Sequence, residues 1–217
     1  TLDSLITYGA KDSVIIQVLP GNYQEQVTIP TLPDLSQNNR VIFQSSTLDS
    51  LDVTLTFTPQ TGDELHTLRF AGTEFVEFKH LTITTGHTES NEIVQIADLA
   101  SNNRLFSNRI LAHAISQTGI GGQPFSENRI EKNTLIGGSK GIHLEGTDFM
   151  SFSNDSTHIT RLTGNTLYQQ TDTAITLKKN LCPVIQGNSI HSSDSSIVGI
   201  FLEELHQTTI LANRISL

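Results

Sequence analysis

The sequence predicts an all-β fold: a right-handed single-stranded parallel β-helix (solenoid) of roughly seven to eight coils, with residues 1–217 as a single domain. Three observations lead to this prediction: the composition, an Asn-containing element that recurs, and a second strand-like element that falls between its copies. A repeat made of short strands is typical of a solenoid, in which each coil adds one strand to several parallel sheets and stacking buries a continuous core.

The composition suits many short strands joined by polar turns. Hydrophobic residues make up 36% of the chain, aromatics 6%, and there is no Trp, so Ile, Leu, Val and Phe must form the core. The formal charge is −9 with only 13 Lys and Arg, which argues against nucleic acid as a partner, because phosphate binding needs a positive surface. The lone Cys182 gives no disulfide framework, and the absence of a long apolar run predicts no membrane insertion.

The first coil is visible in "SVIIQVLPGNYQEQVTIP", residues 13–30. Val14, Ile16 and Val18 alternate with their neighbours, which indicates a strand with one buried face. Pro20-Gly21-Asn22 predicts a turn, and residues 25–29 predict a second strand.

The first recurring element is Asn, any residue, then Ile or Leu. Its gaps are 25, 32, 23 and 25 residues, and its members are Asn108, Asn133, Asn165, Asn188 and Asn213. Equivalent residues of stacked coils lie about 4.7–4.9 Å apart, so each side-chain amide can hydrogen-bond the next. Asn also accepts the left-handed backbone conformation of tight turns. We therefore predict an inward-facing structural ladder rather than a ligand site.

The second element reads "GIHLE" at 141, "AITLK" at 174 and "GIFLE" at 199. When the three copies are aligned, two apolar residues of each copy face inward: Ile142 and Leu144, Ile175 and Leu177, and Ile200 and Leu202. The residues between them face outward and form the predicted binding face: His143, Glu145, Thr176, Lys178, Phe201 and Glu203. Glu145, Lys178 and Glu203 would form a column of alternating charge, in which Lys178 stays protonated.

The stretch "V.PGNY.E.V.I" resembles the opening coil of pectin methylesterases and other proteins of the pectin-lyase-like superfamily. Residues 18–57, followed by "LRFAGTEFVEFKHLTI", resemble β-helix segments of large secreted bacterial surface proteins, which are often multidomain. This resemblance implies the fold. It does not imply one activity, because the fold hosts lyases, hydrolases, epimerases, esterases and non-catalytic adhesins.

The catalytic motifs that the resemblance would imply are largely missing. "GTDFMSFSN" gives Asp148-Phe149 a likeness to the esterase motif "DFIFG", but "LGRPW" and "GQA" do not occur, so we expect Asp148 to lie in a loop. A lyase would need a base and a positive group, for which Lys140, Lys178, Lys179 and Arg161 are candidates. Ca²⁺ would need oxygen ligands, for which Asp172, Glu145 and Glu203 are candidates. We expect His143 and His191 to be surface residues.

These observations predict a non-catalytic segment of a secreted or surface-anchored bacterial protein, adhesive or carbohydrate-binding, with its export signal outside this sequence. The alternative is a lyase-like enzyme that acts on uronic-acid polymers, with its site near His143, Glu145 and Lys178. A third possibility is a spacer without a ligand. The sequence predicts no cofactor, and it does not decide whether the chain binds Ca²⁺. The last residues, "TTILANRISL", stop in mid-pattern, so we expect a fragment of a larger multidomain protein.

Overall fold

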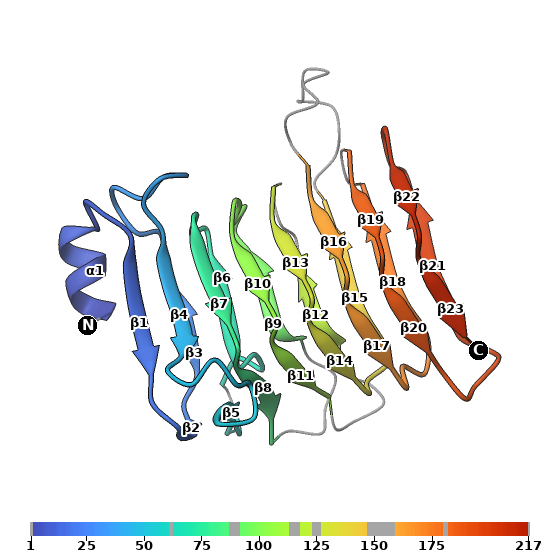
Figure 1. The fold of residues 1–217 in the computed structure, drawn as a ribbon, viewed down its shortest axis with the longest axis horizontal. Helices are drawn as coiled ribbons and strands as arrows, with labels where there is room; N and C mark the ends of the chain where they lie inside the picture. Colours follow the sequence, from blue (N-terminus) through green and yellow to red (C-terminus); the bar gives the residue numbers. More distant parts are fainter. Residues whose placement is uncertain are drawn as a thin grey trace.

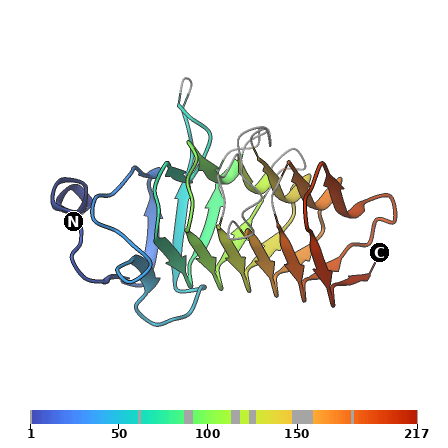
Figure 2. The same cartoon turned by 90° about the horizontal axis from the view of Figure 1, so that it is seen from above.

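The computed structural model describes residues 2–60, 63–86, 92–112, 118–122, 127–146, 159–179 and 182–216. The chain winds into a right-handed parallel β-helix, and the coils follow one another along the long axis from the first residues to the last (Figures 1 and 2). Its three sheets are wholly parallel and hold eight, eight and seven strands, so the solenoid has seven to eight coils. The predicted fold class is confirmed.

Each of the first seven coils contributes one strand to each sheet in turn, and β22 and β23 extend sheets A and B by one further strand each. Sheet A contains β1 (Val14–Val18), β4 (Val41–Ser45), β7 (Val76–Lys79), β10 (Arg104–Phe106), β13 (Arg129–Glu131), β16 (Arg161–Thr163), β19 (Val184–Gln186) and β22 (Thr209–Leu211). Sheet B contains β2 (Gly21–Gln24), β5 (Val53–Phe57), β8 (Thr82–Thr85), β11 (Arg109–Leu111), β14 (Thr134–Ile136), β17 (Thr166–Tyr168), β20 (Ser189–His191) and β23 (Arg214–Ser216). Sheet C contains β3 (Val27–Ile29), β6 (Leu68–Ala71), β9 (Glu92–Ala97), β12 (Thr118–Gly122), β15 (Lys140–Glu145), β18 (Thr173–Lys178) and β21 (Val198–Glu203).

The core is a set of aliphatic stacks that run through these sheets. In sheet C, Ile142 pairs with Ile175 and Ile175 with Ile200, which confirms the predicted alignment of the second repeat element. Ile142 and Ile175 are fully buried, whereas Ile200 in the last coil is only partly buried. Stacking of like residues therefore buries an inward side chain only where a further coil follows.

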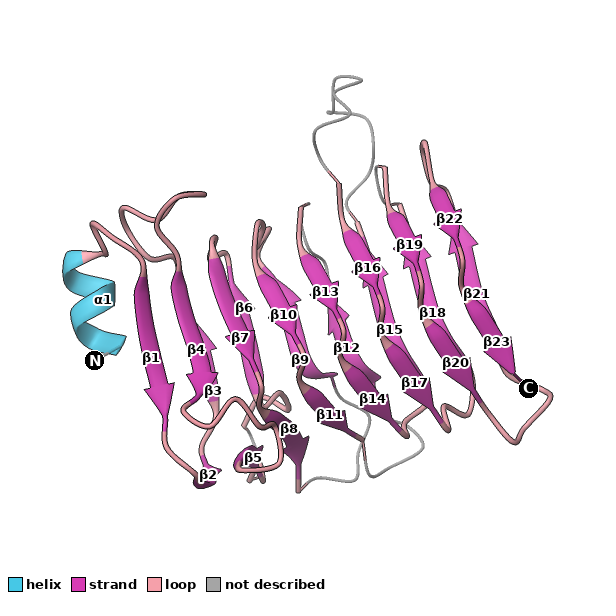
Figure 3. Ribbon diagram, in the orientation of Figure 1, coloured by secondary structure: helices cyan, strands magenta, loops and turns pink. Residues whose placement is uncertain are grey.

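The first coil differs from the prediction at its turn. β1 occupies Val14–Val18 as expected, but Gly21 and Asn22 belong to β2 rather than to a turn. Gly21 pairs with Val53 of the next coil, so backbone pairing between coils overrides the local turn preference. The sequence pattern also missed helix α1 (Leu2–Tyr8), which lies against the first coil (Figure 3) and buries Leu5 in the core. No helix among the described residues is long and apolar enough to cross a membrane.

The five recurring asparagines form a continuous ladder between sheets A and B. Asn165 Oδ1 accepts hydrogen bonds from both the backbone N (3.0 Å) and the Nδ2 (3.1 Å) of Asn133, and Asn188 Oδ1 does the same for Asn165 at 2.9 Å for each bond. The same pattern links Asn108 to Asn133 and Asn188 to Asn213. Each Nδ2 also donates to a backbone carbonyl of the preceding coil, as Asn165 does to Ile130 at 2.7 Å.

The expected conformational reason for asparagine was wrong. None of the five ladder residues has a positive φ; the residue before each one does, namely Ser107 (φ 53°), Lys132 (56°), Gly164 (64°), Gly187 (65°) and Ala212 (55°). The ladder position therefore requires Asn because its side-chain amide both donates and accepts hydrogen bonds. The residue before each Asn adopts the left-handed conformation of the turn. A second, shorter ladder joins Asn103 and Asn128, through the backbone N of Asn103 and Oδ1 of Asn128 at 3.2 Å.

Candidate functional site

The predicted binding residues lie on the outward face of sheet C, on the consecutive strands β15, β18 and β21. Because alternate residues of a strand point to opposite sides, the burial of Ile142 and Leu144 turns His143 and Glu145 outward. His143 pairs in register with Thr176, and Thr176 with Phe201. The structure thus brings the predicted residues together as two neighbouring columns.

The second column contains charged residues that pair with one another. Lys178 lies in register between Glu145 and Glu203, and its Nζ is 2.7 Å from Glu203 Oε2. The hydrogen bond to Glu203 raises the pKa of Lys178, so the amine stays protonated near neutral pH. The ammonium also lies 5.6 Å from the ring centroid of Phe201, within cation–π range. Lys178 is therefore a fixed positive charge and a poor proton acceptor.

The first column offers a ligand less than the sequence predicted. Thr176 points outward but is only 3% exposed, so it does not contribute to the accessible face, whereas Phe201 is 41% exposed. His143 is half-buried, and burial lowers the pKa of its imidazole. Its Nδ1 is buried without a hydrogen-bond partner among the described residues. His143 is therefore neutral at neutral pH, with one ring nitrogen uncommitted.

The same face continues toward the N-terminus into a hollow that sequence reasoning missed. In register, His143 lies beside Gly121, Gly121 beside Gln95, and Gln95 beside Arg69. A cavity of about 460 Å³ opens here, lined by Glu64, Leu65, His66, Arg69, Glu92 and Gln95. This volume lies within the range of small-ligand sites.

Most charged groups of the hollow are already paired. Arg69 forms ion pairs with Glu64 at 2.8 Å and with Asp98 at 2.9 Å. His66 is 4% exposed, with Nδ1 3.3 Å from Glu64 and Nε2 3.1 Å from the Thr28 hydroxyl. Burial lowers the pKa of His66, so it is neutral at neutral pH.

Glu92 is the exception, because its carboxyl lies above Gly121. A Cβ placed on Gly121 would lie 2.5 Å from Glu92 Oε1, so a larger residue here would displace the Glu92 side chain from this position. Burial raises the pKa of Glu92, against the opposing effect of a hydrogen bond from Gln95. The signal in the sequence was the strand-like "TGIGG", since glycine inside a strand marks close approach of another group.

Other sequence candidates are dispersed over the molecule. Arg161 begins β16 in sheet A, on a different sheet from Lys178. His191 stacks on Tyr168 in sheet B, with ring centroids 5.2 Å apart. Within the described ranges, no three His, Cys, Asp or Glu side chains are placed to hold a metal ion, so Asp172, Glu145 and Glu203 are not gathered as a Ca²⁺ site. Asp148 and Phe149 lie outside the described residues.

The fold is similar to that of solved pectin methylesterases. The structure matches the rice weevil enzyme with a TM-score of 0.59 and 14% identity over 90% of this chain, which spans 62% of that enzyme's length. It matches the pectin methylesterase from Yersinia enterocolitica with a TM-score of 0.52 and 6% identity, covering 99% of this chain and 90% of that one. No protein-family model and no curated protein sequence matches this chain. At these identities the likeness establishes a pectin-lyase-like β-helix fold and no activity.

Proposed function

We propose that this chain is a non-catalytic β-helix segment that binds carbohydrate along the outward face of sheet C, within a secreted or surface-anchored bacterial protein. The observation that carries the proposal is the state of the cations on this face. Lys178 and Arg69 are both held by carboxylates at 2.7–2.9 Å, so neither is available as a base. What the face presents instead is an exposed aromatic ring and a polar hollow, which is the mixture that a sugar requires.

The structural neighbours support carbohydrate as the ligand class, since both are named as pectin methylesterases and pectin is a polysaccharide. They do not support esterase activity here, because the sequence lacks the motifs that such an enzyme requires. The repeating outward columns would offer equivalent contacts to successive sugar units, since coil spacing is regular.

The test is binding of wild type and variants to a glycan array, followed by titration with the glycans retained. Phe201→Ala should weaken binding about threefold to tenfold, because an aromatic contact of this kind contributes roughly 0.5–1.5 kcal/mol. The matched control is Tyr168→Ala, since Tyr168 is 39% exposed against 41% for Phe201 but lies in sheet B. Equal losses in the two variants, or no retained glycan, would contradict the proposal.

A lyase acting on a uronic-acid polymer is the second candidate, favoured by Glu92 and His143. The carboxyl of Glu92 is biased toward its neutral acid form and the imidazole of His143 toward its neutral base form, and the two flank Gly121. Such a pair suits proton transfer, but stabilising the enolate also needs a cation that is not already paired, and Lys178 and Arg69 are both paired with carboxylates. Incubation with polygalacturonate and alginate should give no unsaturated product; product that disappears in Glu92→Gln would favour the lyase instead.

A further inference from the structure

A second hollow lies at the beginning of the sheet A strands and is dominated by arginines. It has a volume of about 340 Å³, and its lining includes Arg40, Arg129 and Arg161 together with Phe75, Asn102 and Glu127. Arg129 and Arg161 are register partners at the starts of β13 and β16, and Arg40 immediately precedes β4. Three coils that are far apart in the sequence thus direct three guanidinium groups to one place.

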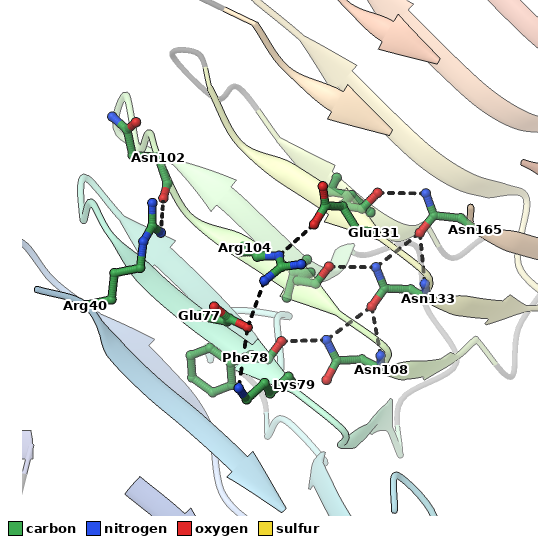
Figure 4. Close-up of polar contacts among 12 residues, drawn as sticks. Arg40, Glu77, Phe78, Lys79, Asn102, Arg104, Asn108, Glu131, Asn133 and Asn165 are labelled. Atoms are coloured by element: carbon green, nitrogen blue, oxygen red, sulfur yellow. Dashed lines mark hydrogen bonds and ion pairs between the residues drawn. The ribbon is translucent and has the colours of Figure 1, made fainter. Parts of the chain in front are cut away.

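These arginines differ from their neighbour Arg104 in their partners. Arg104 lies between two carboxylates, with Nε 2.6 Å from Glu131 and Nη1 3.4 Å from Glu77 (Figure 4). Among the described residues, neither Arg129 nor Arg161 has a carboxylate within ion-pair distance, and Arg40 donates to the backbone carbonyl of Asn102 at 3.0 Å (Figure 4). One carboxylate, that of Glu127, lines the hollow against three guanidinium groups.

This excess of positive charge stands out against the rest of the molecule. The chain carries a net charge of −9 with only 13 Lys and Arg, yet three of its arginines converge on a hollow whose lining contains one carboxylate, that of Glu127. Like charges on adjacent strands repel one another. Burial and the neighbouring Arg129 lower the pKa of Arg40, which agrees with a crowded positive cluster. An anion in the hollow would relieve this repulsion.

The remaining lining decides which anion fits. A guanidinium group presents a planar fork of donors that matches a carboxylate or another oxyanion through two parallel hydrogen bonds. Phe75 adds an aromatic surface, already 5.4 Å from the Arg40 guanidinium, and Asn102 adds polar groups. The volume is at the small end of the range for ligand sites and accommodates a sugar ring.

We propose that this hollow binds the carboxylate of an acidic sugar in an oligosaccharide, held between Arg129 and Arg161. The ligand class rests on the proposed carbohydrate-binding function, but the site is separate from the face of sheet C. It gives the chain a preference for charged over neutral glycans.

The test is isothermal titration with trigalacturonate, with its methyl ester and with inorganic sulfate. The variant Arg129→Gln/Arg161→Gln should weaken trigalacturonate binding by at least about tenfold, because hydrogen bonds to charged groups contribute roughly 1.5–3 kcal/mol. The matched control is Arg109→Gln/Arg214→Gln, which removes the same charge from sheet B and should bind like wild type. Affinity should also fall as salt rises.

Three outcomes would overturn the proposal. If the control double variant loses as much affinity, the effect is net charge rather than a site. If the methyl ester binds as tightly as trigalacturonate, the site does not recognise the carboxylate. If inorganic sulfate binds as tightly as trigalacturonate, the site does not recognise the sugar. If the double variant does not fold, Arg161→Lys replaces it in the test. Lysine keeps the positive charge but lacks the planar guanidinium group, so this variant should still weaken trigalacturonate binding. Binding at the sheet C face is measured separately, with Phe201→Ala and the neutral glycans retained on the array, so failure of that face and failure here remain distinguishable.

Discussion

The asparagine ladder and the Glu145–Lys178–Glu203 column are built in the same way but differ in what surrounds them. Each places equivalent side chains of successive coils opposite one another. Asn108, Asn133, Asn165 and Asn188 are at most 2% exposed and fully hydrogen-bonded, whereas the charged column lies on the surface with Glu203 45% exposed on its side chain. A break in the ladder would leave buried polar groups without partners, and a break in the column would leave groups that water can solvate.

This difference shows where function should be sought in a solenoid. A regular repeat is explained by stacking, whether the column is buried or exposed. The informative positions are those where a column departs from its own pattern. One is Gly121, beside which Glu92 lies over sheet C. The other is Arg129 with Arg161, which among the described residues have no carboxylates like those that accompany Arg104. Both candidate hollows are located at such departures.

We expect the largest change in unfolding free energy from substitutions in the apolar column of sheet A, which is buried in the inner coils and exposed in the last one. Ile185 and Ile210 are register partners in sheet A, but Ile185 is 0% and Ile210 is 53% exposed. Ile185→Ala should lower the free energy of unfolding by about 2–5 kcal/mol through lost burial and a cavity. Ile210→Ala should cost well below 1 kcal/mol, because little surface is buried there. Urea denaturation of both variants measures the contrast, and similar losses would contradict it.

Substitutions in the asparagine ladder should cause the next largest loss of unfolding free energy. Asn165→Ala removes the acceptor for the backbone N and the Nδ2 of Asn133, so we expect a loss of about 1–3 kcal/mol in unfolding free energy. Asn213→Ala, in the last coil and only partly buried, is the matched control and should cost less. An unchanged denaturation midpoint for Asn165→Ala would remove the structural explanation of the repeat.

Glu92 should make stability depend on pH. Its folded pKa is raised by burial, so its contribution is fully present below the ordinary carboxyl pKa and is lost as pH rises through the raised value. Glu92→Gln should therefore stabilise the protein near pH 7, where the native carboxyl is ionised at a cost, and change little near pH 4. Thermal unfolding at both pH values measures this, with Glu145→Gln, a carboxylate on the outward face that is only partly buried, as the control. A stabilisation that is equal at both pH values would show that charge is not its cause.

The smallest effect is expected in the charged column. Lys178→Ala removes an exposed ion pair with Glu203, so the denaturation midpoint should not change measurably. Arg104→Ala is the contrasting variant, because it removes a partner of Glu77, whose side chain is buried. It should lower the midpoint, since a buried carboxylate would lose a charge partner. A marked loss for Lys178→Ala alone would mean that the exposed column stabilises the fold after all.

The sequence by itself determined the fold, the register of the second repeat and the inward residues, because these follow from local periodicity. A strand alternates sides every residue, and an Asn-x-Ile element that recurs at solenoid spacing has one consistent placement. The same rule assigns to the core the residues two positions after the asparagines, namely Ile110, Leu135, Leu167, Ile190 and Ile215. The first four are buried to 1% or less, whereas Ile215 in the last coil is 46% exposed.

Only the tertiary structure decided burial on the outward faces and the identity of the two hollows. Thr176 has the outward register that its sequence position indicates, yet neighbouring groups cover it. Glu92 lies above Gly121 although 29 residues separate them, and Arg129 meets Arg161 across a coil of unusual length. Periodicity specifies which side of a strand a residue occupies. It does not specify which side chain from another coil leans over it, because that depends on the length of every intervening turn and on the space that small residues leave.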